Sequence, residues 1–405
     1  MIRGNRPVPA VVLGLSPTGL YAIRELGATG VPVIGVGPER QAGAASRFLR
    51  EVIIESDEDR RLAKLIDQCA VFESKPLLLP TSDQDLEFIF RNHRLLSQYF
   101  VYQSSYENGL AAQILSKSSF YRLCDEHGID YPSCYTVQPA DLLSLVGSLQ
   151  FPVLLKPSRI HDIKVEMAGR KCWVAQDEKQ YKRVVRAIPY HAGPLIVQEI
   201  VPGPESEITL FTAYFDREGF AHQSFTGRKL RQYPPGFGSA SLVISENEPE
   251  TREIGEGFLS KLRYHGIAAV EFKRDSKTGR RKIIEINPRP SLWLSVSTAS
   301  GKAITIAAYR DMIEQAALPQ EHEQQNGVLW RYPIKDTYSN LFYRLKRNFV
   351  LPAPNVAAAT TATKLISAIS VKGDNSPARL EVLNYLKKAV RRLSLWNKRM
   401  NIGRK

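Results

Sequence analysis

RKIIEINPRP, residues 281–290, is an apolar run that ends in an acidic residue and an amide. Its pattern predicts a β-strand with Glu285 and Asn287 at the end. Because residues i and i+2 of a strand point to the same side, both side chains are expected to offer oxygen atoms to one point. Mg²⁺ prefers such hard ligands and takes the rest from phosphates and water. The alternative is an exposed turn, since Asn-Pro is a common turn pair.

A second strand repeats this pattern. IAAVEFKRD, residues 267–275, carries Glu271 after an apolar run. If the two strands are neighbours, Glu271, Glu285 and Asn287 form a site for a metal and phosphates. Arg289 follows between two prolines, and a guanidinium held there suits a carboxylate or a transferring phosphoryl group.

Two lysines precede these strands. Lys156 ends the apolar strand FPVLLKPS (151–158), where a lysine is costly unless it meets an anion. Lys117, in LSKSSF, begins a predicted helix, a setting that suits phosphate. The alternative for Lys117 is a solvated surface lysine.

Two further segments suit a nucleotide. LIVQEIVPGPESEITL (195–210) reads as two strands joined by a Pro/Gly hinge, whose backbone can contact an adenine edge while Glu205 or Glu207 binds ribose hydroxyls. A plain hairpin crossing is the alternative. FTGRKLRQYPPGFGSAS (225–241) places basic residues before a flexible loop that can close over a triphosphate or an acidic acceptor. Its alternative is a basic surface loop.

The N-terminal part of the chain has a different hydrophobic pattern. Buried apolar runs at 8–15, 31–37 and 75–80 alternate with helical segments. This rhythm predicts a doubly wound parallel sheet, and the later strands and helices predict an α+β body. GLSPTG (14–19) lacks the G-x-G-x-x-G pattern, so a structural turn is favoured over dinucleotide binding.

Bulk composition fits a globular protein, with 43% apolar and 24% charged residues among 405. Apolar runs are too short to span a bilayer, and the start of the chain reads as a strand rather than a signal peptide. The four cysteines are scattered, which argues against a zinc site or a disulfide framework and fits the cytoplasm.

The net positive charge is concentrated in the C-terminal region. Residues 330–405 hold 16 Lys and Arg against 3 Asp and Glu, whereas the other 329 residues hold 39 against 38. A nucleic-acid-binding body is therefore not implied. The amphipathic tail suits an anionic membrane surface, an acidic partner, or simple packing of its leucine face on the body.

Taken together, the order of these motifs resembles the ATP-grasp superfamily over roughly residues 8–325. The segment 225–241 resembles a carboxylate–amine ligase branch that includes D-aspartate-ligase-like enzymes. The resemblance implies a Rossmann-like pre-ATP-grasp domain followed by a two-subdomain ATP-grasp fold and a basic, partly helical tail. The implied boundaries are 1–105, 106–193 (linker helices and N-terminal subdomain), 194–325 (C-terminal subdomain) and 326–405.

The resemblance also implies roles for individual residues. Phosphates would meet Lys117 and Lys156, and Glu207 would hold the ribose. Mg²⁺ or Mn²⁺ would bind Glu271, Glu285 and Asn287. Arg289, with Arg228 and Lys229, would act in the chemical step. The adenine would lie along Gln198, Glu199, Ile200 and Val201. The segment 158–171 has one glycine where many members have several, and Lys171 is the candidate to compensate for the missing glycines.

The activity implied by the resemblance is ligation. A small carboxylate would be activated by ATP as an acyl phosphate and passed to an amine, with release of ADP and phosphate. An ATP-grasp kinase and a non-catalytic nucleotide-binding regulator are the alternatives, and a nucleic-acid-binding protein is a distant one. A homo-oligomer stays open, as does a location at the inner face of the membrane.

Overall fold

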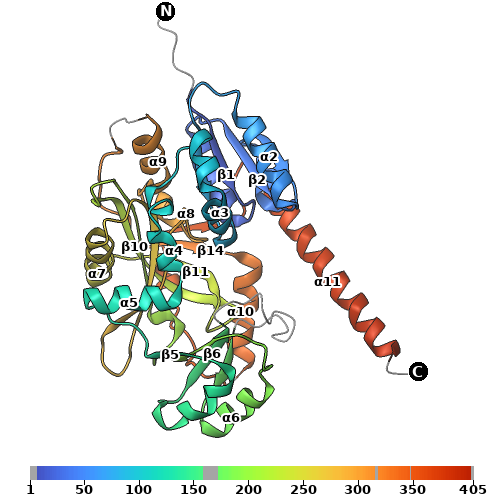
Figure 1. Ribbon diagram of the computed structural model, residues 1–405, viewed down its shortest axis with the longest axis vertical. Helices are drawn as coiled ribbons and strands as arrows, with labels where there is room; N and C mark the ends of the chain where they lie inside the picture. Colours follow the sequence, from blue (N-terminus) through green and yellow to red (C-terminus); the bar gives the residue numbers. More distant parts are fainter. Residues whose placement is uncertain (1–6, 158–171, 315–317, 347, 403–405) are drawn as a thin grey trace, which may run out of the picture.

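The computed structural model describes residues 7–157, 172–314, 318–346 and 348–402. Three β-sheets with their helices build the described part of the chain (Figure 1). The fold is mixed α/β with a parallel sheet at the front, as the apolar runs predict.

The first sheet is wholly parallel, and three of its four strands are apolar and fully buried because helices cover them, whereas the edge strand Leu49–Ile54 is mostly half-buried or exposed. Helix α1 follows the first strand and starts with a proline at its first turn, a position where the missing N–H costs nothing. In spatial order the strands are β3 (Leu49–Ile54), β2 (Val33–Gly37), β1 (Ala10–Leu13) and β4 (Leu77–Pro80). The helices are α1 (Pro17–Ala28), α2 (Glu58–Cys69) and α3 (Asp83–Tyr99).

A second, antiparallel sheet lies at the opposite end of the molecule (Figure 1). Its small core includes Leu155, Val197 and the buried ring of Tyr181 from helix α6. In spatial order the strands are β5 (Cys134–Val137), β8 (Leu195–Glu199), β6 (Val153–Pro157) and β7 (Trp173–Ala175). Helix α6 (Glu178–Ala187) packs on this sheet, whereas α4 (Leu110–Leu115) and α5 (Lys117–His127) pack on the third sheet.

The third sheet has seven strands and buries both faces. In β9, Phe211 and Phe215 join one apolar cluster, whereas Leu210 and Tyr214 join the cluster shared with the first sheet. In spatial order the strands are β13 (Arg281–Asn287), β12 (Gly266–Arg274), β9 (Ile208–Phe215), β10 (Ala221–Tyr233), β11 (Ser239–Ser245), β14 (Val328–Arg331) and β15 (Lys364–Ser367). Its helices are α7 (Pro249–Lys261), α8 (Ser295–Ala299) and α9 (Ile304–Tyr309).

The region 326–405 differs from the helical tail that its sequence suggests. Strand β14 pairs with β11 and β15, so it extends the third sheet. The reason is local, because Val328 and Trp330 alternate with half-buried residues and are both fully buried. Helix α10 (Pro333–Leu345) lies between β14 and β15 in the chain, and α11 (Ser376–Ile402) follows β15. Among the described residues, no helix combines the length and hydrophobicity needed to cross a bilayer.

Candidate active site

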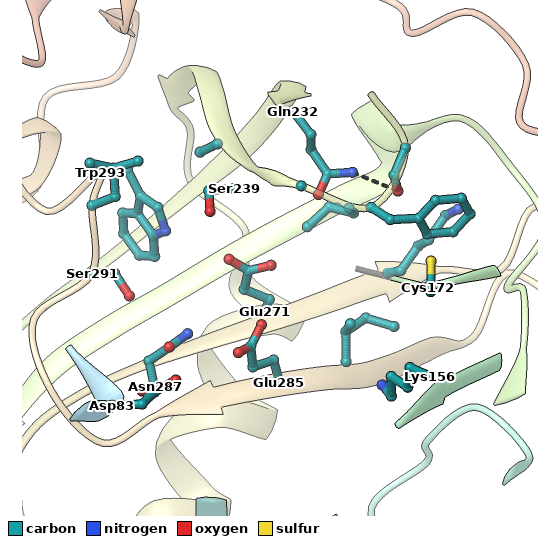
Figure 2. A pocket seen from close by; sticks show the side chains of 18 of the residues that line it. Asp83, Lys156, Cys172, Gln232, Ser239, Glu271, Glu285, Asn287, Ser291 and Trp293 are labelled. Atoms are coloured by element: carbon teal, nitrogen blue, oxygen red, sulfur yellow. Dashed lines mark hydrogen bonds between the residues drawn. The ribbon is translucent and has the colours of Figure 1, made fainter. Parts of the chain in front are cut away.

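A cavity of about 630 Å³ lies where the second and third sheets meet, and the start of α1 also borders it. Figure 2 shows side chains from several strands directed into it. Most residues that the sequence singled out line this cavity. They are Lys117, Lys156, Gln198, Glu199, Ile200, Val201, Glu271, Glu285, Asn287 and Arg289.

The candidate metal ligands come from two paired strands. Glu271 of β12 lies directly opposite Glu285 of β13, and Asn287 follows two residues later. Side chains opposite each other in an antiparallel pair have Cβ atoms roughly 5 Å apart. Figure 2 shows all three side chains on the same side of the two strands, facing the cavity.

A β-bulge gives β13 this orientation. The pairing steps from Glu271–Glu285 to Phe272–Ile283, so Ile284 is an extra residue in the strand. Ile283 and Ile286 both pack in the apolar core, whereas Ile284 and Glu285 line the cavity. Strict alternation would put Ile283 and Glu285 on one face. The bulge therefore lets the strand keep its core residues and still present the glutamate, a common arrangement beside active sites.

Of the three basic residues expected in the chemical step, Lys229 and Arg228 have different surroundings. The Lys229 side chain is 1% exposed, and its Nζ lies 2.5 Å from Oε2 of Glu271. It does not line the cavity itself, but it holds the carboxylate of a candidate metal ligand that does. Arg228, its neighbour in β10, faces the opposite way and pairs with Glu246 at 2.7 Å. The structure thus brings neither residue to the cavity.

The oxygen set fits Mg²⁺. It consists of the two carboxylates of Glu271 and Glu285 and the amide oxygen of Asn287, all hard donors. Within the described residues, no group of three or more His, Cys, Asp or Glu side chains is arranged to hold a metal by itself. A cation bound between the two glutamates would therefore complete its shell with phosphate and water oxygens, as Mg²⁺ does in nucleotide sites.

Lysines collect across the cavity from these oxygens. The Lys156 ammonium donates to Oε1 of Gln198 at 2.9 Å. Burial, and then the neighbouring Lys117, lower the pKa of Lys156 to about 8. Two cations brought together in a half-buried site favour an anion between them. The arrangement suits the phosphates of a nucleotide.

Lys273 is a cavity residue that the sequence analysis missed. It lies two residues after Glu271 on the same face of β12 and is 6% exposed. Burial lowers its pKa to about 8. Within the described part of the chain its ammonium makes no hydrogen bond or ion pair. The available signal was the spacing in VEFKRD, because alternation puts Glu271 and Lys273 on one side.

The hinge after β8 borders the cavity through Ile200 and Val201, which are almost fully buried. The Ile200 N–H donates to the Pro152 carbonyl at 3.1 Å. No backbone partner of the Val201 N–H occurs among the described residues, which leaves that donor for an adenine edge. Glu199 accepts from Lys282 at 2.9 Å and from the Ser133 N–H at 3.1 Å.

Neither glutamate proposed for the ribose lines the cavity. Glu207 is turned to the surface by Arg274, with Nε 2.7 Å from Oε2. Glu205 is fully buried and accepts from the backbone N–H groups of Gly236 at 2.7 Å and Gln232 at 3.0 Å. Glu205 therefore fixes the loop between β10 and β11 instead.

That loop forms one wall of the cavity through residues 236–240. Gly236 has φ +82°, a left-handed conformation that favours glycine. A Cβ on Gly238 would lie 2.1 Å from the carbonyl carbon of Tyr233. Close backbone packing therefore requires glycine at 238.

Arg289 links the cavity to the first sheet. Its guanidinium pairs with Asp83 at 2.7 Å, the first residue of α3, and donates to the Pro290 carbonyl at 3.1 Å. Ser16, Pro17 and Thr18 from the turn before and into α1 border the same side. The sequence did not identify this acidic partner, and Lys171 lies outside the described residues. Other cavity residues that it missed are Gln232, Ser239, Ser291, Trp293 and Lys335.

Solved structures with a similar fold include a synthetase and a ligase. The ADP complex of N5-carboxyaminoimidazole ribonucleotide synthetase superposes with a TM-score of 0.62 at 14% identity, over 80% of this chain and 82% of that chain. L-amino acid ligase from Bacillus licheniformis gives 0.55 at 14%, over 76% and 75%. The chain has the ATP-grasp fold.

Another ATP-grasp structure was solved with nucleotide bound. The biotin carboxylase domain dimer of Hydrogenobacter thermophilus 2-oxoglutarate carboxylase, in complex with MgADP, ADP and bicarbonate, gives a TM-score of 0.60 at 14% identity, over 80% of this chain and 74% of that chain. Two of the solved structures that share this fold thus contain ADP.

One ATP-grasp ligase also resembles the chain in sequence. D-aspartate ligase of Enterococcus faecium (strain Aus0004) is 28% identical over 242 residues, which are 56% of this chain and 56% of that ligase. The chain therefore matches about half of that relative's length. No family model matches the chain. The resemblance to ATP-grasp carboxylate–amine ligases thus rests on both sequence and fold.

Proposed function

We propose that the protein is a Mg-ATP-dependent ligase that joins a small carboxylate to an amine. One observation carries this proposal: Glu271, Glu285 and Asn287 face Lys156 across a single cavity of an ATP-grasp fold. That cavity offers oxygen ligands on one side and cations on the other, as a metal–triphosphate complex requires.

The nucleotide would lie along the cavity. Lys117, Lys156 and Lys273 would contact its phosphates, and the Val201 N–H would meet its base. A divalent cation at the two glutamates and Asn287 would neutralise charge on the phosphates. Mn²⁺ accepts the same oxygen ligands, so we propose that it can replace Mg²⁺.

The reaction has two steps. A carboxylate oxygen of the substrate attacks the γ-phosphorus of ATP, and ADP leaves with the electrons of the broken P–O bond. The amine nitrogen then attacks the acyl carbon of the mixed anhydride, phosphate leaves, and the nitrogen loses a proton. Arg289 borders the cavity and would orient the carboxylate and the departing phosphate. The protein positions and shields these groups, and no covalent enzyme intermediate is needed.

The names of two relatives support a proposal for the substrate class. Two of them are named as ligases of amino acids, a D-aspartate ligase and an L-amino acid ligase. We propose an amino acid as the carboxylate and a small amine or amino-acid derivative as the acceptor. The four cysteines are scattered along the sequence with no C-x-x-C pair, which fits a cytoplasmic enzyme.

Product analysis tests this function. The purified protein is incubated with MgATP, an amino acid and a pool of amines, and products are identified by mass spectrometry. The proposal expects ADP, phosphate and a condensed product in equal amounts, each dependent on both substrates. ADP without phosphate, together with a phosphorylated product, would identify a kinase. Nucleotide binding without turnover under all combinations would favour a regulator.

A further inference from the structure

Helix α11 (Ser376–Ile402) leaves the body of the molecule and projects away from it (Figure 1). Its first turns are anchored. Ala378 packs against the main apolar cluster, and the Tyr332 hydroxyl donates to Glu381. Just before the helix, Asp374 pairs with Arg24 of α1 at 2.8 Å. The base of α11 is therefore fixed to the body, whereas the rest extends outward.

A row of aliphatic side chains on this helix is exposed. The exposed fractions are 46% for Val382, 52% for Leu383, 57% for Leu386 and 65% for Val390. At about 100° per residue, these four positions fall within one arc of about 100°. The described part of the chain supplies nothing that covers them.

Basic residues border this aliphatic row. The helix contains seven Lys and Arg residues against the single acidic Glu381. By helical geometry, Lys387 lies about 40° beyond the edge of the aliphatic arc, and Lys388 lies about 140° beyond it. The helix thus has an apolar side and a cationic side in one continuous segment.

The combination of an apolar side and a cationic side favours one class of binding partner over the others. A second copy of α11 would bring like charges together, which opposes pairing. Nucleic-acid phosphates would use the lysines and arginines but leave the aliphatic row in water. An anionic lipid surface suits both sides of the helix, because acyl chains can contact the aliphatic row and anionic headgroups can bind the lysines and arginines.

We propose that α11 binds an anionic membrane surface, lying in the headgroup region with Val382, Leu383, Leu386 and Val390 inserted. Because its base is fixed to the body, the helix would hold the cavity-bearing domains close to the lipid surface. This inference is independent of the ligase activity, since none of the four residues borders the cavity.

Vesicle co-sedimentation of the full chain tests the proposal. The probes are vesicles of phosphatidylcholine with phosphatidylglycerol and vesicles of phosphatidylcholine alone. The wild type is expected to bind the anionic vesicles and to lose binding in high salt. The double substitutions Leu386→Ser with Val390→Ser, and Lys387→Gln with Lys388→Gln, should each weaken binding by about tenfold or more.

Matched controls test whether vesicle binding depends on α11 or reflects nonspecific adsorption of exposed aliphatic and basic residues. Val71→Ser removes a 77% exposed aliphatic residue elsewhere, and Lys179→Gln removes a basic residue from α6; both should bind as the wild type does. Thermal unfolding and sedimentation without vesicles show that each variant is folded and soluble. Equal binding to both vesicle types, or undiminished binding by both double variants, overturns the proposal. Binding to polyglutamate but not to anionic vesicles also overturns it, in favour of an acidic protein partner.

Discussion

Among the candidate metal ligands, Glu285 is expected to matter for turnover rather than for stability. Glu285→Gln keeps the shape of the side chain but removes a charged ligand, so turnover should fall by about 100-fold or more. The apparent melting temperature should change little, because the side chain borders the cavity rather than the core. Glu207→Gln is the matched control, since Arg274 holds that carboxylate outside the cavity. Full activity of Glu285→Gln would remove the metal assignment.

Lys229 is expected to act through Glu271. Lys229→Met leaves a mostly buried carboxylate without its partner and should lower the free energy of unfolding by about 3 kcal/mol in urea titrations. Arg228→Met breaks the adjacent, more exposed pair with Glu246 and should cost no more than about 1 kcal/mol. Equal effects of the two substitutions would contradict the supporting role of Lys229.

Lys273 should contact the nucleotide. Lys273→Met keeps the length of the side chain and removes the ammonium, so the KM for ATP should rise by about tenfold or more, the size of one charge-assisted hydrogen bond. Lys277→Met, in the exposed turn after β12, should leave the KM unchanged. An unaltered KM in Lys273→Met would show that its ammonium serves the fold alone.

The sequence made part of this site predictable. Glu285, Asn287 and Lys156 stand at the ends of apolar runs, and local alternation is enough to single them out. The pairing of Arg289 with Asp83 joins residues 206 positions apart, and no local pattern encodes it. Glu207 was assigned to the ribose because it follows the hinge, but only the fold shows that Arg274 turns it outward.

Among the elements, the loop between β10 and β11 is tightly constrained by close backbone packing. Gly238→Ala would place a Cβ against the Tyr233 backbone, so the loop must move. A displacement of about 1 Å in a cavity wall can cost about 100-fold in rate, and kcat/KM should fall by about 10- to 100-fold.

Gly257→Ala is the control for that substitution. Its Cβ would meet nothing within 4 Å on helix α7, so activity should be unchanged and stability slightly higher. Wild-type kcat/KM in Gly238→Ala would show that the loop wall is not part of the site.

Strand positions were easier to predict than strand irregularities. The apolar run that gives β13 is evident in the sequence, but the bulge at Ile284 is not, since Ile283, Ile284 and Ile286 look alike. The same limit applies to β14 and β15. Their short apolar stretches lie in a basic region, and only pairing with β11 makes them strands.

For the whole molecule, His265 connects the linker before α4 to the third sheet. Its Nδ1 accepts from the Ser104 N–H at 3.0 Å, so a neutral ring carries its proton on Nε2, 3.3 Å from the Tyr214 hydroxyl. Burial lowers the pKa of His265 from 6.5 to about 4. Between these values the unfolded chain binds a proton that the folded chain does not. The free energy of unfolding should therefore fall as the pH falls through this window, by up to about 3 kcal/mol.

Urea unfolding between pH 7 and pH 4 measures this dependence. His265→Asn keeps an acceptor near the position of Nδ1 but cannot titrate, so its stability should vary less with pH than that of the wild type. His322→Asn alters an exposed histidine and should retain the wild-type profile. Parallel pH profiles for the wild type and His265→Asn would exclude His265 as the source.

The central claim concerns one point between neighbouring strands, where oxygen atoms of Glu271, Glu285 and Asn287 hold a cation that bridges nucleotide phosphates. A crystal structure of the protein with ADP and Mn²⁺ tests it most directly, because manganese is located by anomalous scattering. The account predicts an anomalous peak in contact with these three side chains and with a phosphate oxygen, with the adenine at the Val201 hinge. A manganese ion bound elsewhere, or a nucleotide outside this cavity, would contradict it.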